Sequence, residues 1–346
     1  NQVNKSLVVM DEKVGRSRIH FLETIRQYAR DRLFETREVP AVRDRHLDFF
    51  AEQVLEGISL DSDATHLTLF SAMGSPEMLA WVARVRPDSD NVRVAIQWAL
   101  QKDPARALAM AIKLAPFFVF EGVSLESRPW LEESLLAVEE LDRTASESSP
   151  LREKLLLQGR LWKGNLQLGE GHNVEAVETL KGVVETARQL GSSEQLAMAL
   201  GLQSLALVFL GRPGAYDIAA EGLAIMKESS ERSLQGLPLG SMFMAKIQEG
   251  DLETAKALRE EIRTLIAEST FINALQIVTL ARTASISSDA EDAEVLLIQA
   301  RDMFDRFGSL NFHTMIDSEI AHLRRRSGDD AMAAVIYRRT IRQWQD

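Results

Sequence analysis

Hydrophobic and polar positions change their period near the start of the chain, which predicts strands first and helices afterwards. Two β-prone runs, Ser6–Val9 and Arg18–Phe21, flank a polar stretch that contains Gly15, and this pattern is typical of a β-hairpin. From Glu23 to Glu35 the apolar residues recur at helical spacing instead. The residues predicted on the apolar side of this helix are Ile25, Tyr28, Ala29 and Leu33.

Everything after this segment has a helical pattern. A second helix is predicted after Pro40 and a further one over Asp90–Gln101, with Val92, Ala95, Ile96 and Ala99 on one side. The polar, serine-rich stretch Thr144–Pro150 is the best linker candidate. The second helix is expected to carry Val42, Leu47, Phe49 and Phe50. Four prolines fall where helix starts or breaks are predicted: Pro76, Pro87, Pro104 and Pro129.

A pattern recurs five times after Leu151: an apolar helix, a short turn, and a second helix with an alanine early in it. The turns are Gly169–Asn173, Gly211–Tyr216, Glu249–Glu253, Ser287–Glu291 and Ser327–Asp330. The alanines are Ala176, Ala219, Ala255, Ala293 and Ala333, at spacings of 43, 36, 38 and 40 residues. Twelve or thirteen residues before them stand Gly164, Ala206, Phe243, Ala281 and Ala321, so Phe243 is the one large residue of the series.

Small residues at these places allow the two antiparallel helices of a unit to approach closely. No helix pair can bury its apolar face alone, so the units are expected to stack around a continuous core. The predicted fold class is therefore all-α: an α-solenoid of helix pairs with a small β-hairpin and helix at its start. An irregular helical domain with alanines at chance positions is the alternative.

The repeated units resemble tetratricopeptide repeats in their longer-period form, and EGDLETAKAL (Glu249–Leu258) matches the family's turn and second-helix start. They depart from that pattern because the tryptophan and tyrosine of the family's first helix are mostly missing. The third unit, with Phe243, is expected to pack less regularly.

The first half is similar to STAND-class (signal-transduction ATPase) transcriptional regulators of the LuxR-type, AfsR-type and MalT-like group. The similar segments are VNKSLVV (Val3–Val9), RIHFLETIRQYARDRL (Arg18–Leu33), VRDRHLDFFAE (Val42–Glu52) and DNVRVAIQWAL (Asp90–Leu100). The resemblance implies a winged-helix remnant over 1–48, a helical connector over 49–149 and a repeat domain over 150–346. Many members carry a nucleotide-sensing histidine where this chain has Leu22; His20, two residues upstream, is more readily interpreted as a surface or packing residue.

Composition restricts the chemistry. The chain has 346 residues, a net charge of −11 and no cysteine, which excludes disulfides and thiolate metal sites and argues against a surface lying mainly on DNA phosphates. Its longest apolar stretch, Ala107–Phe120, is too short to span a bilayer, so no membrane partner is expected. Without a signal peptide, a cytoplasmic location is the default. Because the chain begins with Asn1 and its end still has a helical pattern, we expect a fragment of a longer protein.

Motifs for catalysis or cofactor binding are missing from the sequence. There is no GxxxxGK[ST] phosphate loop, no HExxH and no GxSxG, so we expect no enzyme activity, no metal and no cofactor in this fragment. ATP or ADP is expected in the missing upstream ATPase domain, as the resemblance implies. Two arginine clusters, Arg324–Arg326 and Arg338, Arg339 and Arg342, are predicted to lie on a solvent face, without direct contact to nucleic acid.

A ligand groove is predicted on the first helices of the stacked units, since these line the concave face of such solenoids. The side chains predicted to face the groove are Gln158, Asn165, Gln203, Arg282, Ser318, His322 and Arg325. Leu207, Met244 and Val278 are predicted to supply apolar wall between them. The end with Arg282, His322 and Arg325 is expected to favour an anionic group, although each of these residues could equally be an ordinary solvated one.

The resemblance implies the sensor and autoinhibitory part of an ATPase that regulates transcription, which binds an inducer, a protein or a peptide in this groove. The alternative is a constitutive tetratricopeptide scaffold that binds a protein or peptide without a nucleotide switch.

Overall fold

The computed structural model describes residues 8–13, 16–56, 72–121, 124–145, 149–228, 232–266, 271–286, 290–306 and 310–343. It begins with an antiparallel hairpin of β1 (Val8–Lys13) and β2 (Arg16–Phe21), in which Val8 pairs with Phe21 and Lys13 with Arg16. The predicted hairpin is confirmed, but most of the stretch expected as a polar loop belongs to the strands. Backbone pairing continues through these polar residues because the ladder hydrogen bonds do not depend on the side chains.

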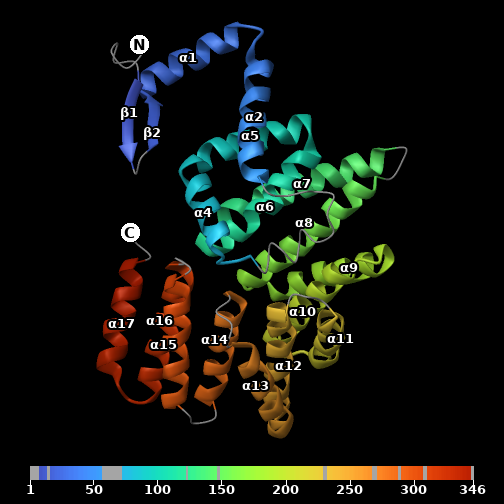
Figure 1. Cartoon of the computed structure of the whole chain (residues 1–346), viewed down its shortest axis with the longest axis vertical. Coiled ribbons are helices and arrows are strands. Elements are labelled where there is room, and N and C mark those ends of the chain that lie inside the picture. The colour runs from blue at the N-terminus through green and yellow to red at the C-terminus, as the bar shows by residue number, and fades with distance from the viewer. Residues whose placement is uncertain are drawn as a thin grey trace.

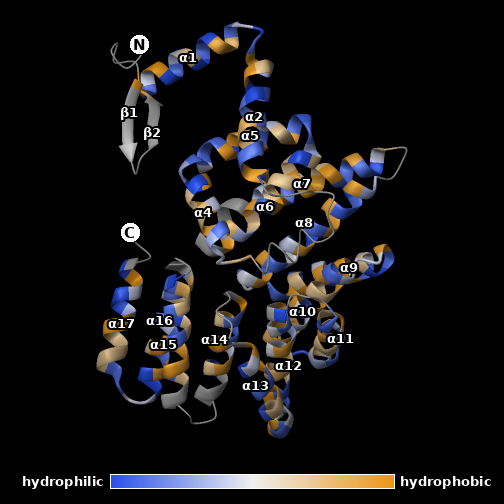
Figure 2. Cartoon of the chain, in the orientation of Figure 1, coloured by the Kyte–Doolittle hydropathy of each residue, from blue (hydrophilic) through white to orange (hydrophobic). Residues whose placement is uncertain are grey.

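Helix α1 (Glu23–Glu35) follows with the predicted bounds. None of its residues, all of which the structure describes, is buried: Ile25 and Leu33 are half-buried, while Tyr28 and Ala29 are exposed. Figure 1 shows the hairpin and α1 projecting from the rest of the molecule, and Figure 2 shows apolar residues along α1 despite this exposure. The predicted apolar side therefore has no covering element within the described part of the chain.

The connector is built on α2 (Val39–Leu55), α4 (Pro76–Val85), the 3-10 turn η2 (Arg86–Asp88) and α5 (Ser89–Lys102). The predicted inner face of α5 is confirmed, since its buried residues are Val92, Ala95, Ile96 and Ala99. In α2, Leu47 and Phe50 are buried in the same core as α5, whereas Phe49 is exposed. The boundary predicted at 48/49 thus lies inside a continuous helix.

Helix α6 (Pro104–Glu121) is the central element of the connector and contacts α2, α5, α7 (Ser124–Thr144) and α8. One side of α6 (Ala107, Met110, Leu114 and Phe117) packs into the core with α2 and α5. Leu108, Ile112 and Ala115 belong instead to the core that continues into the repeats. The boundary predicted at 149/150 therefore lies within one continuous core and does not separate two of them. Pro129, expected at a helix start or break, lies inside α7, where the buried Leu131 and half-buried Trp130 follow it.

Five helix pairs complete the chain. They are α8 (Pro150–Gly169) with α9 (Asn173–Leu190), α10 (Ser193–Phe209) with α11 (Ala215–Lys227), α12 (Gly236–Glu249) with α13 (Leu252–Ile266), α14 (Phe271–Ile286) with α15 (Ala290–Arg306), and α16 (Leu310–Arg326) with α17 (Asp330–Gln343). A 3-10 turn, η3 (Arg232–Gln235), precedes α12. Four of the pairs are separated at predicted turns, the turn predicted at Ser287–Glu291 lies largely outside the described residues, and the five alanines are all buried. The predicted all-α solenoid is confirmed.

Close approach within a pair is clearest between α8 and α9. A methyl group placed on Gly164 would lie 2.7 Å from the buried side chain of Leu180, so only glycine fits here at this helix separation. In the third unit the larger Phe243 is buried within a separate cluster formed mainly by α12 and α13. No helix in the described part of the chain is long and apolar enough to cross a membrane.

Candidate ligand-binding face

The first helix of each pair forms the inner layer of the solenoid. Helices α8, α10, α12, α14 and α16 each contact the next one in this series, and every second helix packs on its own first helix. Most of the buried polar side chains in the described residues lie on this layer, including Gln158, Gln203, Asn273, Gln276 and Asp317. The inner layer therefore carries hydrogen-bonding groups within an otherwise apolar core.

The first two units are more closed than the sequence predicts. Gln158 and Gln203 are only 5% and 8% exposed, and Leu207 and Val278, predicted as groove wall, are buried as well. Asn165 and Met244 are half-buried. The placement of Gln158 and Gln203 on an open groove is thus corrected: both lie in packed core.

Glycines on the inner layer explain this closure. Gly201 in α10 faces Leu237 in α12, where an added methyl group would lie 3.0 Å from the leucine side chain. Gly236 and Gly240 in α12 both face Gln276 in α14. Small residues at these positions let neighbouring first helices approach until their side chains fill the space between them. The sequence pattern did not predict this contact between neighbouring first helices, because it located small residues only within pairs.

The predicted polar residues of the last two units remain at least partly accessible, although Val278 of the fourth unit is buried. Arg282 in α14 is exposed, and its Nε and Nη2 both donate to Glu319 Oε1 of α16, at 3.0 and 2.6 Å. Ser318 is half-buried and donates to the carbonyl of Thr314, while His322 and Arg325 are exposed. Arg282 is consequently brought to α16, but Glu319 balances its charge, so the predicted anion-favouring end is less cationic than three free basic residues would be.

A buried carboxylate that the sequence did not reveal lies beside this end. Asp317 in α16 is fully buried; its Oδ2 accepts a hydrogen bond of 2.6 Å from Arg339 in α17, and its Oδ1 lies 3.4 Å from Arg301 Nη1 in α15. His313 Nε2 lies 3.4 Å from Asp317 Oδ2, and its Nδ1 contacts Asp305. These contacts tie α15, α16 and α17 together. No clear signal for them is present in the sequence, because α16 also carries Glu319 and three arginines.

The arginine clusters are thus only partly solvent-facing. Arg339 binds Asp317, and Arg324 binds Glu294 of α15 and lies 3.6 Å from Asp329. Arg324 is half-buried, whereas the other members of the clusters are exposed: Arg325, Arg326, Arg338, Arg339 and Arg342.

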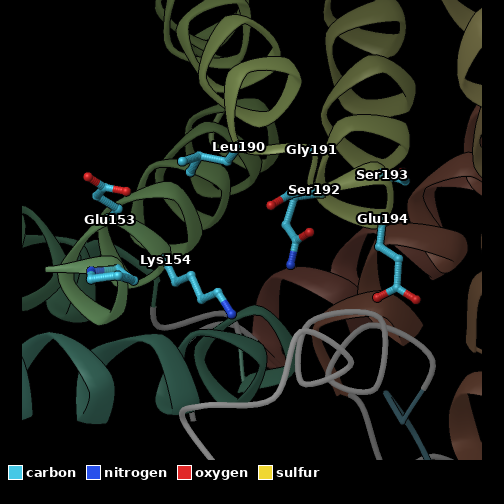
Figure 3. Close-up of a pocket in the computed structure, with 9 residues that line it drawn as sticks. Glu153, Lys154, Leu190, Gly191, Ser192, Ser193 and Glu194 are labelled. Carbon is cyan, nitrogen blue, oxygen red and sulfur yellow. The ribbon is translucent and has the colours of Figure 1, made fainter.

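A pocket of about 510 Å³ lies where the start of α8 meets the turn between α9 and α10. Figure 3 shows Glu153 and Lys154 on the α8 side and Leu190, Ser192, Ser193 and Glu194 on the other. Both acidic and basic groups line it, in contrast to the mostly apolar walls typical of small-molecule sites. Among the described residues no group of three or more His, Asp or Glu could hold a metal ion.

An ion-pair network joins the connector to the first unit. Arg128 in α7 donates to Glu170 Oε2 at 2.7 Å and to Glu132 at 3.2 Å, and the hydrogen bond to Glu170 is the main reason why the pKa of Arg128 is raised. Lys163 in α8 lies 3.7 Å from Glu132. The inner layer is therefore fixed to the connector at this end.

Sequence comparison relates the chain to transcriptional regulators. It is 28% identical, over 203 residues, to proteins of Mycobacterium bovis and Mycobacterium tuberculosis that bear the provisional name of HTH-type transcriptional regulator. This match covers 57% of the present chain and 21% of each relative, so the matched region is about a fifth of the relatives' length. No family model matches the chain.

Comparison of structures supports the repeat fold. A Rap protein crystallised in complex with competence and sporulation factor is similar with a TM-score of 0.53 and 15% identity, over 93% of this chain and 92% of that one. A STAND protein with a tetratricopeptide-repeat sensor from Pyrococcus horikoshii is similar over 99% of this chain and 51% of that one, at 15% identity and a TM-score of 0.48. At 15% identity the likeness to the Rap protein concerns the fold alone.

Proposed function

We propose that this chain is the sensor and autoinhibitory region of a STAND-class ATPase that regulates transcription, within the LuxR-type, AfsR-type and MalT-like group. The observation that carries the proposal is the identity of 28% to HTH-type transcriptional regulators, found in a chain that folds as a helical-repeat solenoid. A helical-repeat region in such a regulator has the form of a binding module rather than of a DNA-reading module.

In this proposal β1, β2 and α1 are the end of a winged-helix domain that residues upstream complete. The exposure of Phe21, Leu22 and Tyr28, at 50%, 44% and 58%, supports this assignment. Isolated helices of this length are marginal in water, and a two-stranded hairpin is also marginally stable on its own. Covering these side chains with an upstream element would supply the missing burial.

The solenoid binds a protein or peptide inducer at the accessible end of its inner layer, on α14 and α16. The Rap protein of similar fold, which was crystallised with competence and sporulation factor, supports a binding role for this architecture. The fragment itself performs no catalysis, and ATP or ADP is bound by the ATPase domain upstream.

A transcription reporter tests the proposal in the full-length regulator. Deleting the last helix pair, residues 310–346, removes part of the autoinhibitory region without cutting the core shared by the connector and the first unit, so transcription without inducer is expected to rise. Arg282→Ala and Arg325→Ala should weaken the response to inducer without raising basal transcription, and Arg338→Ala on α17 is the matched surface control. Unchanged basal transcription after the deletion would support a constitutive scaffold instead.

A further inference from the structure

The last unit of the solenoid returns to the connector. Helix α16 contacts α6, although about two hundred residues of chain separate them. Figure 1 shows α16, in red, lying below the region of α4 and α6. With this contact the inner helices form a closed cycle: α6 contacts α8, each first helix contacts the next as far as α16, and α16 contacts α6 again.

The α6–α16 junction differs physically from the others in this cycle. Every other neighbouring pair of inner helices is joined by one second helix and its turns, so the ends cannot move far apart. At the α6–α16 junction the linking chain is the whole solenoid, and only non-covalent packing holds the two helices together. Opening a junction of this kind increases the conformational entropy of the chain and loses the packing of one interface only.

The side of α16 that faces α6 follows from its other contacts. Glu319 points to α14 through Arg282, and Phe312 stacks on Phe304 of α15 with ring centroids 4.8 Å apart. Asp317 points to α17 through Arg339. At 3.6 residues per turn, Phe312 and Glu319 lie on one side of the helix. Asp317 lies on a second side together with His313 and Arg324, which contact Asp305 and Glu294 of α15. The side left between Asp317 and Glu319 carries Met315, Ser318 and His322.

Burial along this remaining side changes in the middle of the helix. Met315 and Ser318 are half-buried, with Met315 packed against the main core, whereas His322, two turns after Met315 on the same side, is exposed. A covering element therefore reaches only the first half of α16. Since α14, α15 and α17 contact the other sides of α16, α6 is the element that covers this side.

Helix α6 also reaches the N-terminal part of the chain. Its opposite side, with Met110 and Leu114, packs in the core that contains Leu47 and Val54 of α2. A change at α16 therefore has a short path of packed helices, through α6, to α2, which follows α1 in the chain. A two-state contact with such a path is the physical requirement for coupling between distant sites.

We propose that the contact between α6 and the first half of α16 is a conformational latch, which closes the inner layer and opens while the helix pairs stay folded. The proposal goes beyond the proposed function and does not depend on the ATPase assignment, because opening can be measured on the chain without ligand.

The absence of cysteine from the sequence permits a direct test by pulsed electron paramagnetic resonance. Spin labels at Glu133→Cys in α7 and Arg338→Cys in α17, both exposed positions, report the separation across the junction. Labels at Glu133→Cys and Glu178→Cys in α9 provide a pair that does not cross it. Met315→Glu introduces a charge at the covered side of α16, and His322→Glu introduces the same charge two turns away at the exposed part of that side.

The unsubstituted chain is expected to show one narrow distance across the junction. Met315→Glu should shift most of the population to longer distances, His322→Glu should keep the original distance, and the pair within α7 and α9 should be unaffected by both. An unchanged distance in Met315→Glu would overturn the latch. Loss of helix content throughout the Met315→Glu chain, measured by circular dichroism, would overturn it too, because α16 would then be an inseparable part of the core.

Discussion

Arg339 in α17 donates a hydrogen bond of 2.6 Å to Asp317 in α16, a carboxylate that is fully buried although Arg339 itself is half exposed. Removing this donor leaves a buried charge with fewer partners. We expect Arg339→Ala to lower the free energy of unfolding by about 1–3 kcal/mol. Urea denaturation measures the loss. The neighbouring Arg338, which is exposed and donates to the carbonyl of Ala334 in its own helix, is the control, and Arg338→Ala should change stability by less than about 0.5 kcal/mol. Equal losses in the two variants would contradict the role of the pair.

Gly164 and Gly182 provide a matched test of close packing within one unit. An alanine methyl group at position 164 meets Leu180 at 2.7 Å, whereas at position 182 nothing lies within 4 Å. Gly182→Ala should therefore raise the Tm, because alanine is favoured over glycine in a helix by about 0.5–1 kcal/mol. Gly164→Ala should lower the Tm in spite of the same propensity gain. A rise in both variants would mean that α8 and α9 separate easily.

The repeat alignment makes a second prediction about packing. Ala255 and Ala293 are both buried, so a tryptophan at either position must force helices apart. Overpacking costs about 1–3 kcal/mol or more, and Ala255→Trp and Ala293→Trp should both melt clearly below the original chain. Glu260→Ala, at an exposed position of the same helix as Ala255, should melt nearly as the original does. Thermal unfolding followed by circular dichroism distinguishes these results.

His46 makes the connector sensitive to acid. Burial lowers the pKa of His46 below its ordinary value of 6.5, and a hydrogen bond with Asn91 offsets part of this effect. Because the unfolded chain then binds a proton more readily than the folded one, stability is expected to fall as the pH drops below 6.5 and to level off once the folded histidine titrates. His46→Gln should flatten this decrease between about pH 7.5 and pH 5. Parallel Tm profiles for the original chain and His46→Gln would remove His46 as the cause.

The absence of a phosphate loop from the sequence predicts that the purified chain neither binds ATP tightly nor hydrolyses it. Isothermal titration with ATP and a phosphate-release assay on the gel-filtration peak measure both properties. Turnover that follows the peak of this chain through successive purification steps would show a nucleotide site that the motifs do not reveal.

The sequence predicts local structure well where the apolar face of a helix packs on one neighbouring element. The inner face of α5 and the four repeat turns that the structure describes are of this kind, because the local apolar period alone decides them. The predicted core of α1 failed in a different way: the spacing of Ile25 and Leu33 is helical, but no described element covers them. Periodicity shows which side of a helix is apolar and does not reveal what packs on it.

The candidate site was harder to predict for a physical reason. Whether Gln203 faces a groove or a core depends on how closely the next first helix approaches, and this distance is set by Gly201 together with Leu237, 36 residues further along the chain. The partners of Asp317 come from three helices, including Arg339, 22 residues later. Such contacts depend on the stacking of units, which no single segment encodes.

The position of α6 in both cores has a consequence for how the molecule loses its structure. An open row of repeats can fray from either end, one unit at a time, because each unit contacts only its neighbours. Here α6 packs with α2 and α5 on one side, with α7 and α8 on another, and touches the final unit through α16. Neither terminal unit of the row is therefore an isolated end. Unfolding of α6 would unfold the connector and destabilise both ends of the solenoid together.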